Sequence, residues 1–141
     1  ATDLLAEAKL SPELRNEALY YRAKAYTKQK ADKKAVDDLR ELAKDTRNAY
    51  GAEAKYLVAQ SLYDAKEYNA AEKELLNYME QSTPHAYWLA RSFVLLSDVY
   101  AAMGKDLDAR QYLLSLQQNY QGNDDIATMI ESRLSKLKVK N

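Results

Sequence analysis

The sequence predicts an all-α protein, and three features of its 141 residues lead to this prediction. Only three glycines and two prolines occur, which is too few for the many turns of an all-β fold. Alanine, leucine, lysine, glutamate and glutamine are abundant, and these residues favour helices. The third feature is an internal repeat in which small residues recur at a fixed spacing.

The repeat consists of three segments that align without a gap, beginning at Leu19, Lys55 and Phe93. In each segment a small residue is followed 12 positions later by an alanine, and four positions after that by a leucine. Because antiparallel helices approach closely only where side chains are small, each pair of small residues predicts a helix crossing. The three sets are Ala23, Ala35 and Leu39; Ala59, Ala71 and Leu75; and Ser97, Ala109 and Leu113.

The first helix of each pair has a start signal. The stretches at Ser11 and Thr83 both place a hydroxyl N-cap before a proline in the first turn. Asn48 is a weaker cap at the same phase of the repeat. The expected helices cover residues 12–29, 32–45, 48–65, 68–81, 84–103 and 106–120, preceded at 2–10 by the end of an earlier helix.

Signals inside the pairs and at the end of the chain complete this assignment. Asp32 and Asp106 are expected to cap second helices, and Gly104 is expected to end a first helix. After Gly122 the apolar residues form one helical stripe, which predicts a capping helix at 124–138 that covers the last repeat. The residues of the stripe are Ile126, Met129, Ile130, Leu134 and Leu137.

The repeat resembles the tetratricopeptide repeat, whose first helix reads W-x2-L-G-x2-Y and whose second reads A-x3-F, in about 34 residues. Two departures are Arg22 and Lys55, which stand where the family has apolar residues, and the spacings of 36 and 38 residues also exceed the family period. The residues that fill the first-helix pattern are Leu19, Arg22, Ala23 and Tyr26; Lys55, Val58, Ala59 and Leu62; and Phe93, Leu96, Ser97 and Tyr100.

This resemblance implies a right-handed α-α superhelix, a tetratricopeptide solenoid of about three helix pairs with the capping helix at its end. The pairs would cover 12–47, 48–83 and 84–121 within a single domain spanning 1–141. The tyrosine-rich first helices are similar to those of bacterial cell-envelope members, so we expect a periplasmic or envelope location, with the cytoplasm as the alternative. Because the sequence begins without methionine in what reads as a helix, we expect a fragment of a longer protein.

Composition argues against several other classes of function. The chain has one histidine, His85, and no cysteine, which leaves no ligand set for a standard zinc site. It also lacks a glycine-rich phosphate loop and a nucleophile elbow, so we expect no enzyme, no catalytic residue, no metal and no cofactor. Lys plus Arg and Asp plus Glu both number 21, so the basic excess of a nucleic-acid binder is missing. No apolar run approaches the roughly 18 residues of a membrane span.

The resemblance implies that the first helices form a concave face that binds a peptide or a partner protein. Tyrosines mixed with charges of both signs suit such a surface, and we expect them to be exposed there. The alternatives are that the tyrosines only pack between repeats, as we expect about half of them to do, that the array is a structural spacer, or that it binds RNA. The candidate partner-binding residues are Tyr20, Lys24, Tyr56, Gln60, Tyr63, Arg91 and Asp98.

Two further points concern this face. One subclass of the family grips the C-terminal carboxylate of chaperones, but Tyr20, Tyr56 and Val94 stand where that clamp needs a basic residue. We therefore do not expect membership of that subclass. His85 and Trp88 share a helix face with Arg91, which predicts a helix start whose aromatic ring packs on the neighbouring repeat; the alternative is a ligand contact.

Overall fold

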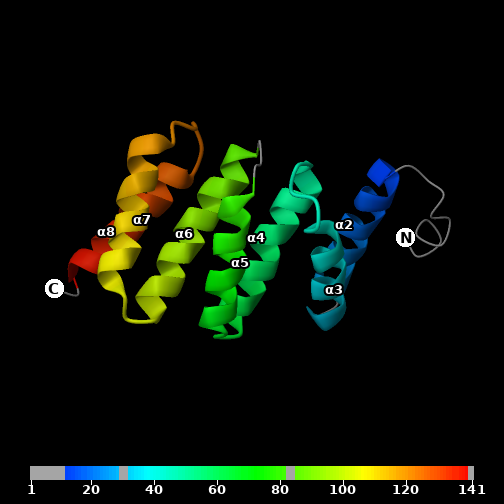
Figure 1. The fold of residues 1–141 in the computed structure, drawn as a ribbon, viewed down its shortest axis with the longest axis horizontal. Coiled ribbons are helices and arrows are strands. Elements are labelled where there is room, and N and C mark those ends of the chain that lie inside the picture. The colour runs from blue at the N-terminus through cyan, green and yellow to red at the C-terminus, as the bar shows by residue number, and fades with distance from the viewer. Residues whose placement is uncertain (1–11, 29–31, 82–84, 140–141) are drawn as a thin grey trace.

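The computed structural model describes residues 12–28, 32–81 and 85–139, which form helices and short connections (Figure 1). The expected helix boundaries agree with it to within three residues. The expected helix at 2–10 and the caps at Ser11 and Thr83 lie outside the described residues. The helices are α2 (Pro12–Lys28), α3 (Asp32–Leu42), α4 (Ala49–Asp64), α5 (Tyr68–Glu80), α6 (Ala86–Ala102), α7 (Asp106–Asn119) and α8 (Ile126–Val139).

These seven helices pack in sequence as antiparallel pairs, which confirms the all-α prediction. Helices α2, α4, α6 and α8 contact one another in succession and form one layer. Helices α3, α5 and α7 each pack against the two even-numbered helices beside them. Their backbones do not approach one another closely in the described part of the chain, but α3 meets α5 through an ion pair of 3.4 Å between Arg40 and Glu74. We call the surface of α2, α4, α6 and α8 that is turned away from α3, α5 and α7 the even-helix face.

The small residues of the repeat lie at the helix crossings, as the spacing predicts. Ala59, Ala71 and Ala109 are each 0% exposed, and Ser97 is 1% exposed. The leucine that follows each alanine is buried as well. A longer side chain at any of these crossings would push two helix backbones apart.

The two charged departures from the family pattern have partners on the second helix of their own pair. The Arg22 guanidinium bonds Asp38 at 2.6 and 2.8 Å, and Lys55 Nζ lies 2.8 Å from Glu74. Asp38 and Glu74 occupy equivalent positions of the repeat. In the third pair the equivalent residue is Tyr112, and there it meets the ring of Phe93 at 5.9 Å. The same position of the second helix thus contacts a side chain of the first helix in every pair, through an ion pair in the first two pairs and through aromatic rings in the third.

The turns after α4 and α6 are the same motif, 38 residues apart. Each contains a residue in the left-handed conformation, Lys66 with φ 63° and Gly104 with φ 76°. In the first turn Lys66 N donates to Tyr63 O, and Glu67 N donates to Leu62 O; the second turn repeats both bonds at Gly104 and Lys105. This pattern is a Schellman motif, so the prediction that Gly104 ends a first helix is confirmed.

The cap predictions have different outcomes. Asn48 caps α4 as expected, because its side chain accepts a hydrogen bond of 2.8 Å from the Gly51 amide. The expectation for Asp106 is wrong: the Schellman turn places Lys105 at the N-cap without a side-chain cap, and Asp106 already lies in the first turn of α7. The side chain of Asp32 lies outside the described residues.

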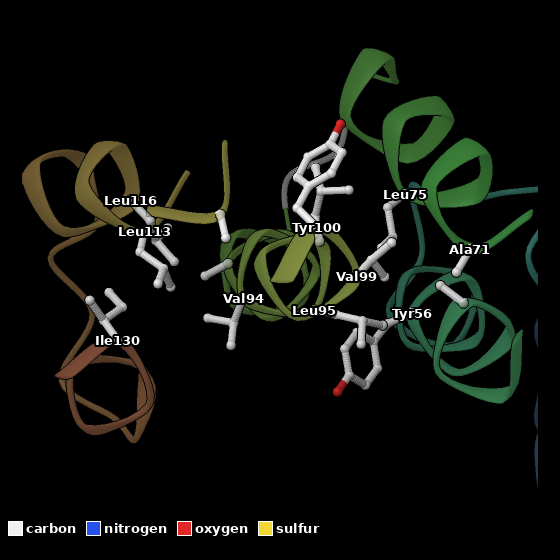
Figure 2. Packing of buried hydrophobic residues seen from close by; sticks show 14 of the residues in the cluster. Tyr56, Ala71, Leu75, Val94, Leu95, Val99, Tyr100, Leu113, Leu116 and Ile130 are labelled. Atoms are coloured by element: carbon white, nitrogen blue, oxygen red, sulfur yellow. The ribbon is translucent and has the colours of Figure 1, made fainter. Parts of the chain in front are cut away.

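The final helix packs on the third pair as predicted. Ile126, Ile130 and Leu137 are buried in α8, while Met129 and Leu134 are half-buried. In Figure 2, Leu113 and Leu116 of α7 point toward Ile130. Helix α8 contacts α6 as well as α7, so it occupies the place that a fourth first helix would have.

Candidate functional site

The even-helix face carries the seven candidate residues, and the structure divides them among three local clusters. Helix α2 supplies Tyr20 and Lys24, α4 supplies three residues, and α6 supplies Arg91 and Asp98. Within each cluster a side chain of one even-numbered helix contacts a side chain of the next. The clusters lie in chain order along the layer, so together they extend from α2 to α8.

The first cluster joins α2 to α4. Both candidate residues of α2 converge on Glu53, since the Tyr20 hydroxyl donates to it at 3.1 Å and Lys24 Nζ lies 3.4 Å from it. The Tyr20 ring also lies 4.8 Å from that of Tyr50. Burial and the Glu53 carboxylate raise the pKa of Tyr20. The Glu53 carboxylate partly neutralises the charge of Lys24. Because Lys24 is exposed, its ammonium group remains accessible to a partner.

The second cluster surrounds Arg91 with aromatic rings. The centre of its guanidinium lies 4.8 Å from the ring centroid of Tyr56, 5.8 Å from that of Tyr87 and 5.9 Å from that of Trp88. It also donates to the Tyr56 and Tyr87 hydroxyls, at 2.9 Å each. Aromatic faces attract a cation, and the two hydrogen bonds fix the orientation of this one.

Each of those hydroxyls has one hydrogen, and both hydrogens are used elsewhere. Tyr56 donates to Gln60 at 3.0 Å, and Tyr87 donates to Asp125 at 3.0 Å. Both oxygens therefore face Arg91 as acceptors. Gln60 in turn donates to Asp64 at 2.9 Å, so the candidate amide belongs to the same network.

Tyr56 itself corrects one expectation, because its side chain is only 6% exposed. Its ring belongs to the main hydrophobic cluster, beside Ala59 and Leu95. In Figure 2 the hydroxyls of Tyr56 and Tyr100 lie on opposite sides of α6. Tyr56 therefore packs between repeats, whereas Arg91 is half-buried and remains partly accessible.

The third cluster contains a pocket. Arg133 of α8 bonds Asp98 with N–O distances of 3.2 and 3.3 Å, and Tyr63 of α4 is half-buried nearby. Burial, followed by the Asp98 charge, raises the pKa of Tyr63. We call the pocket, of about 270 Å³, the Ala101 pocket; it is lined by Tyr63, Ser97, Asp98, Ala101, Ala102, Arg133, Lys136 and Leu137.

Sequence reasoning missed two contributors to these clusters. Tyr87 is four residues before Arg91, which is the spacing at which helical side chains meet. This contact could therefore have been predicted from the sequence. Arg133 could have been found only by placing α8 in the position of a fourth first helix, because the capping helix has no alignment to the repeat.

His85 does not join the Arg91 cluster, although the sequence places both on one helix face. It stands at the N-cap of α6, just before the first turn in which it was expected. Its Nε2 lies 2.8 Å from the Arg47 carbonyl oxygen, and since a carbonyl only accepts, this nitrogen carries the hydrogen. His85 thus ties the start of α6 to the connection between α3 and α4.

A larger pocket, of about 660 Å³, lies between α3 and α4 and contains none of the candidate residues. Its floor includes Val58 and Leu62. Their equivalents in the third pair are the larger Leu96 and Tyr100, which are buried there. The pocket is therefore explained by smaller side chains at one seam of the repeat.

Four findings bear on other functions. Within residues 12–28, 32–81 and 85–139, no group of three or more His, Cys, Asp or Glu side chains is placed to hold a metal ion. The helices formed by those same residues include none with the length and apolar character needed to span a bilayer. No protein-family model matches the sequence, and no curated protein matches it either.

Proposed function

We propose that this chain is a tetratricopeptide-type scaffold whose even-helix face binds a segment of a partner protein. The even-helix face corresponds to the concave face that the sequence resemblance implies. The observation that carries the proposal is the row of half-buried and exposed polar side chains along it, including Tyr20, Lys24, Gln60, Tyr63 and Arg91. Tyrosine and arginine are enriched where proteins bind one another, because they combine a large contact area with polar groups.

The repeated geometry supports the tetratricopeptide part of this proposal. Small residues meet at each helix crossing, and the turns after α4 and α6 share their hydrogen bonds. The even-numbered helices form a continuous layer, as the first helices of such an array would.

The charges on this face favour a protein partner over a nucleic acid. Lys24 is paired with Glu53, and Arg133 is paired with Asp98. A nucleic-acid surface needs a row of unpaired basic residues that can displace counterions from phosphates, and Arg91 and Lys136, which are in no ion pair among the described residues, do not form such a row. Acidic residues alternate with the basic ones here, which suits a polypeptide of mixed charge.

The experiment is site-specific photo-cross-linking in cells that produce the protein. A photoreactive amino acid is placed at Lys24 or at Ala102, two exposed positions of the even-helix face. The control position is Gln111, which is exposed on α7 in the other layer. We expect a discrete protein adduct from the first two positions and none from the control.

Three results would count against the proposal. Equal adducts from Gln111 would show contact that is not specific to the even-helix face. Absence of any adduct at Lys24 and Ala102, in a protein shown to be folded, would favour the structural spacer. Recovery of RNA at those positions, with binding that falls steeply as salt rises, would favour the nucleic-acid alternative.

A further inference from the structure

Arg91 has no direct carboxylate partner among the described residues, whereas Lys24 and Arg133 on the same face each have one. In the part of the chain that the structure describes, every ion pair on this face involves Lys24 or Arg133. Arg91 is held instead by two neutral hydroxyls and three aromatic rings. Its charge is therefore oriented by neutral groups, and the Asp125 carboxylate is linked to it only through the Tyr87 hydroxyl.

The guanidinium also keeps unused donors. Of the five N–H groups of an arginine, two bond the hydroxyls of Tyr56 and Tyr87. The described residues supply no acceptor to the remaining three, so these are open to a ligand. A carboxylate suits them best, since it can accept two parallel N–H bonds from one guanidinium.

The Ala101 pocket lies farther along the same stripe of α6. Arg91, Asp98 and Ala101 are spaced by seven and three residues, so their side chains share one face of the helix. The apolar part of the pocket lining comes from the two alanines, the ring of Tyr63 and the side chain of Leu137. A volume of about 270 Å³ is slightly below the range of small-molecule sites, and it suits one bulky side chain.

The helix sets the distance between these two features. Arg91 and Ala101 are ten residues apart, which is roughly 15 Å along the axis of α6. An extended peptide advances roughly 3.3 Å per residue, so about four or five residues cover this distance. The surface continues beyond Arg91 onto α4 and α2, so a bound chain has no need to end there.

We propose that the even-helix face binds an extended peptide that places an acidic side chain on Arg91 and a bulky apolar side chain in the Ala101 pocket, about four or five residues away. This inference rests on the proposed function and specifies its ligand. The carboxylate is that of an Asp or Glu side chain within the peptide.

The test titrates the isotope-labelled 141-residue chain with synthetic peptides and follows it by NMR. The probe is acetyl-Glu-Ser-Thr-Ser-Trp-amide, with its reverse-order version because the face does not fix chain direction. We expect one of the two to shift both the Arg91 Nε–H signal and the Ala101 amide signal. Replacing Glu by Gln, or placing Glu next to Trp in a peptide of the same composition, should weaken binding about tenfold or more.

A further peptide separates the two sources of a carboxylate. It has Gln in place of Glu and a free C-terminus in place of the amide. Under the proposal it binds as weakly as the capped Gln peptide. If it binds better than the Glu probe, the site recognises a chain end and the proposed acidic side chain is wrong.

Matched variants check where the peptide binds. Arg91→Gln should reduce binding of the Glu probe to the level of the Gln peptide, whereas Arg110→Gln, on α7, removes the same charge without effect. Ala101→Leu should fill the pocket and weaken the probe, while Ala127→Leu, exposed on α8, should not. Because Arg91→Gln could loosen the packing of Tyr56, the comparison of peptides on the unaltered protein decides the result.

The proposal is overturned if the unaltered protein binds all peptides equally, or if the Arg91 and Ala101 signals do not move. With cross-links still forming at Lys24 and Ala102, that result would reject this ligand and leave the scaffold function standing. If those cross-links are absent as well, the scaffold function fails together with the inference that rests on it.

Discussion

At the scale of single residues, Lys66 shows how the repeat tolerates local strain. Its φ of 63° lies in the left-handed region, which costs a residue with a side chain about 1–2 kcal/mol. The next repeat has Gly104 in the same place, with φ 76° and the same turn hydrogen bonds. Lys66 is exposed, so nothing in its burial requires the side chain.

Lys66→Gly is therefore expected to stabilise the protein by about 0.5–1 kcal/mol, after the loss of backbone entropy by glycine is subtracted. Chemical denaturation measures the change. Ala65→Gly is the control, because Ala65 has a φ of −82° and gains nothing from glycine. If both variants were destabilised equally, the left-handed conformation at Lys66 would carry no cost.

Gly51 is required for the close approach of two backbone segments. A Cβ atom at this position would lie 1.8 Å from the Asp45 carbonyl oxygen. Gly51→Ala should thus displace the first turn of α4 and destabilise the fold by about 1–3 kcal/mol. Ala49→Gly, at an exposed position of the same turn, should change the free energy of unfolding less.

Tyr120 predicts a pH dependence at the connection to α8. Its hydroxyl bonds Asp124, whose carboxylate raises the pKa of Tyr120 to about 12. The unfolded chain releases this proton near its ordinary pKa of 10, so the stabilisation is complete below pH 10 and is lost as the pH approaches 12. Tyr120→Phe should therefore have a lower free energy of unfolding than the unaltered protein, and this difference should be largest below pH 10. A difference that stays constant to pH 12 would contradict this assignment.

At the scale of helices, the sequence was most informative where it repeats. Small and apolar residues mark one helix crossing in each of the three repeats. That local periodicity placed the helices within three residues of their observed ends. It did not place Tyr56 in the core, because burial there depends on how closely α6 packs against α4. Nor could it pair Asp98 with Arg133, since the capping helix lies outside the repeat. Contacts between helices decide such details, and one repeat does not encode them.

The crossing of α4 and α5 gives the test at this scale. Ala59 and Ala71 are both 0% exposed, so Ala59→Leu has no space for the added carbons. The variant should lose about 1–3 kcal/mol of stability, measured by thermal or chemical denaturation. Ala127→Leu, at an exposed position of α8, should behave like the unaltered protein. An unchanged melting temperature for Ala59→Leu would show that the register of this pair is wrong.

At the scale of the whole molecule, the hydrophobic core consists of two clusters of unequal size. The larger cluster contains residues of every helix from α4 through α8, and Figure 2 shows part of it around α6. The smaller cluster joins α2 and α3 to α4. Leu57 and Leu62, both on α4, are half-buried and pack against both clusters. Helix α4 is thus the apolar link between them, and the only ion pair that joins α3 to α5 in the described residues is the one between Arg40 and Glu74.

This division implies that the chain does not open as a single cooperative unit. The α2–α3 pair can separate from α4 while the larger cluster stays intact, because its apolar contacts reach only α4. The ion pair from Arg40 to Glu74 adds little, since Arg40 is exposed to solvent. Native-state hydrogen exchange should show amides of α2 and α3, such as that of Leu39, exchanging about tenfold faster than that of Leu96. Equal protection throughout would mean one cooperative unit. Partial opening would carry Tyr20 and Lys24 away from Glu53 while Arg91 stayed in place, so a bound partner could leave in two steps.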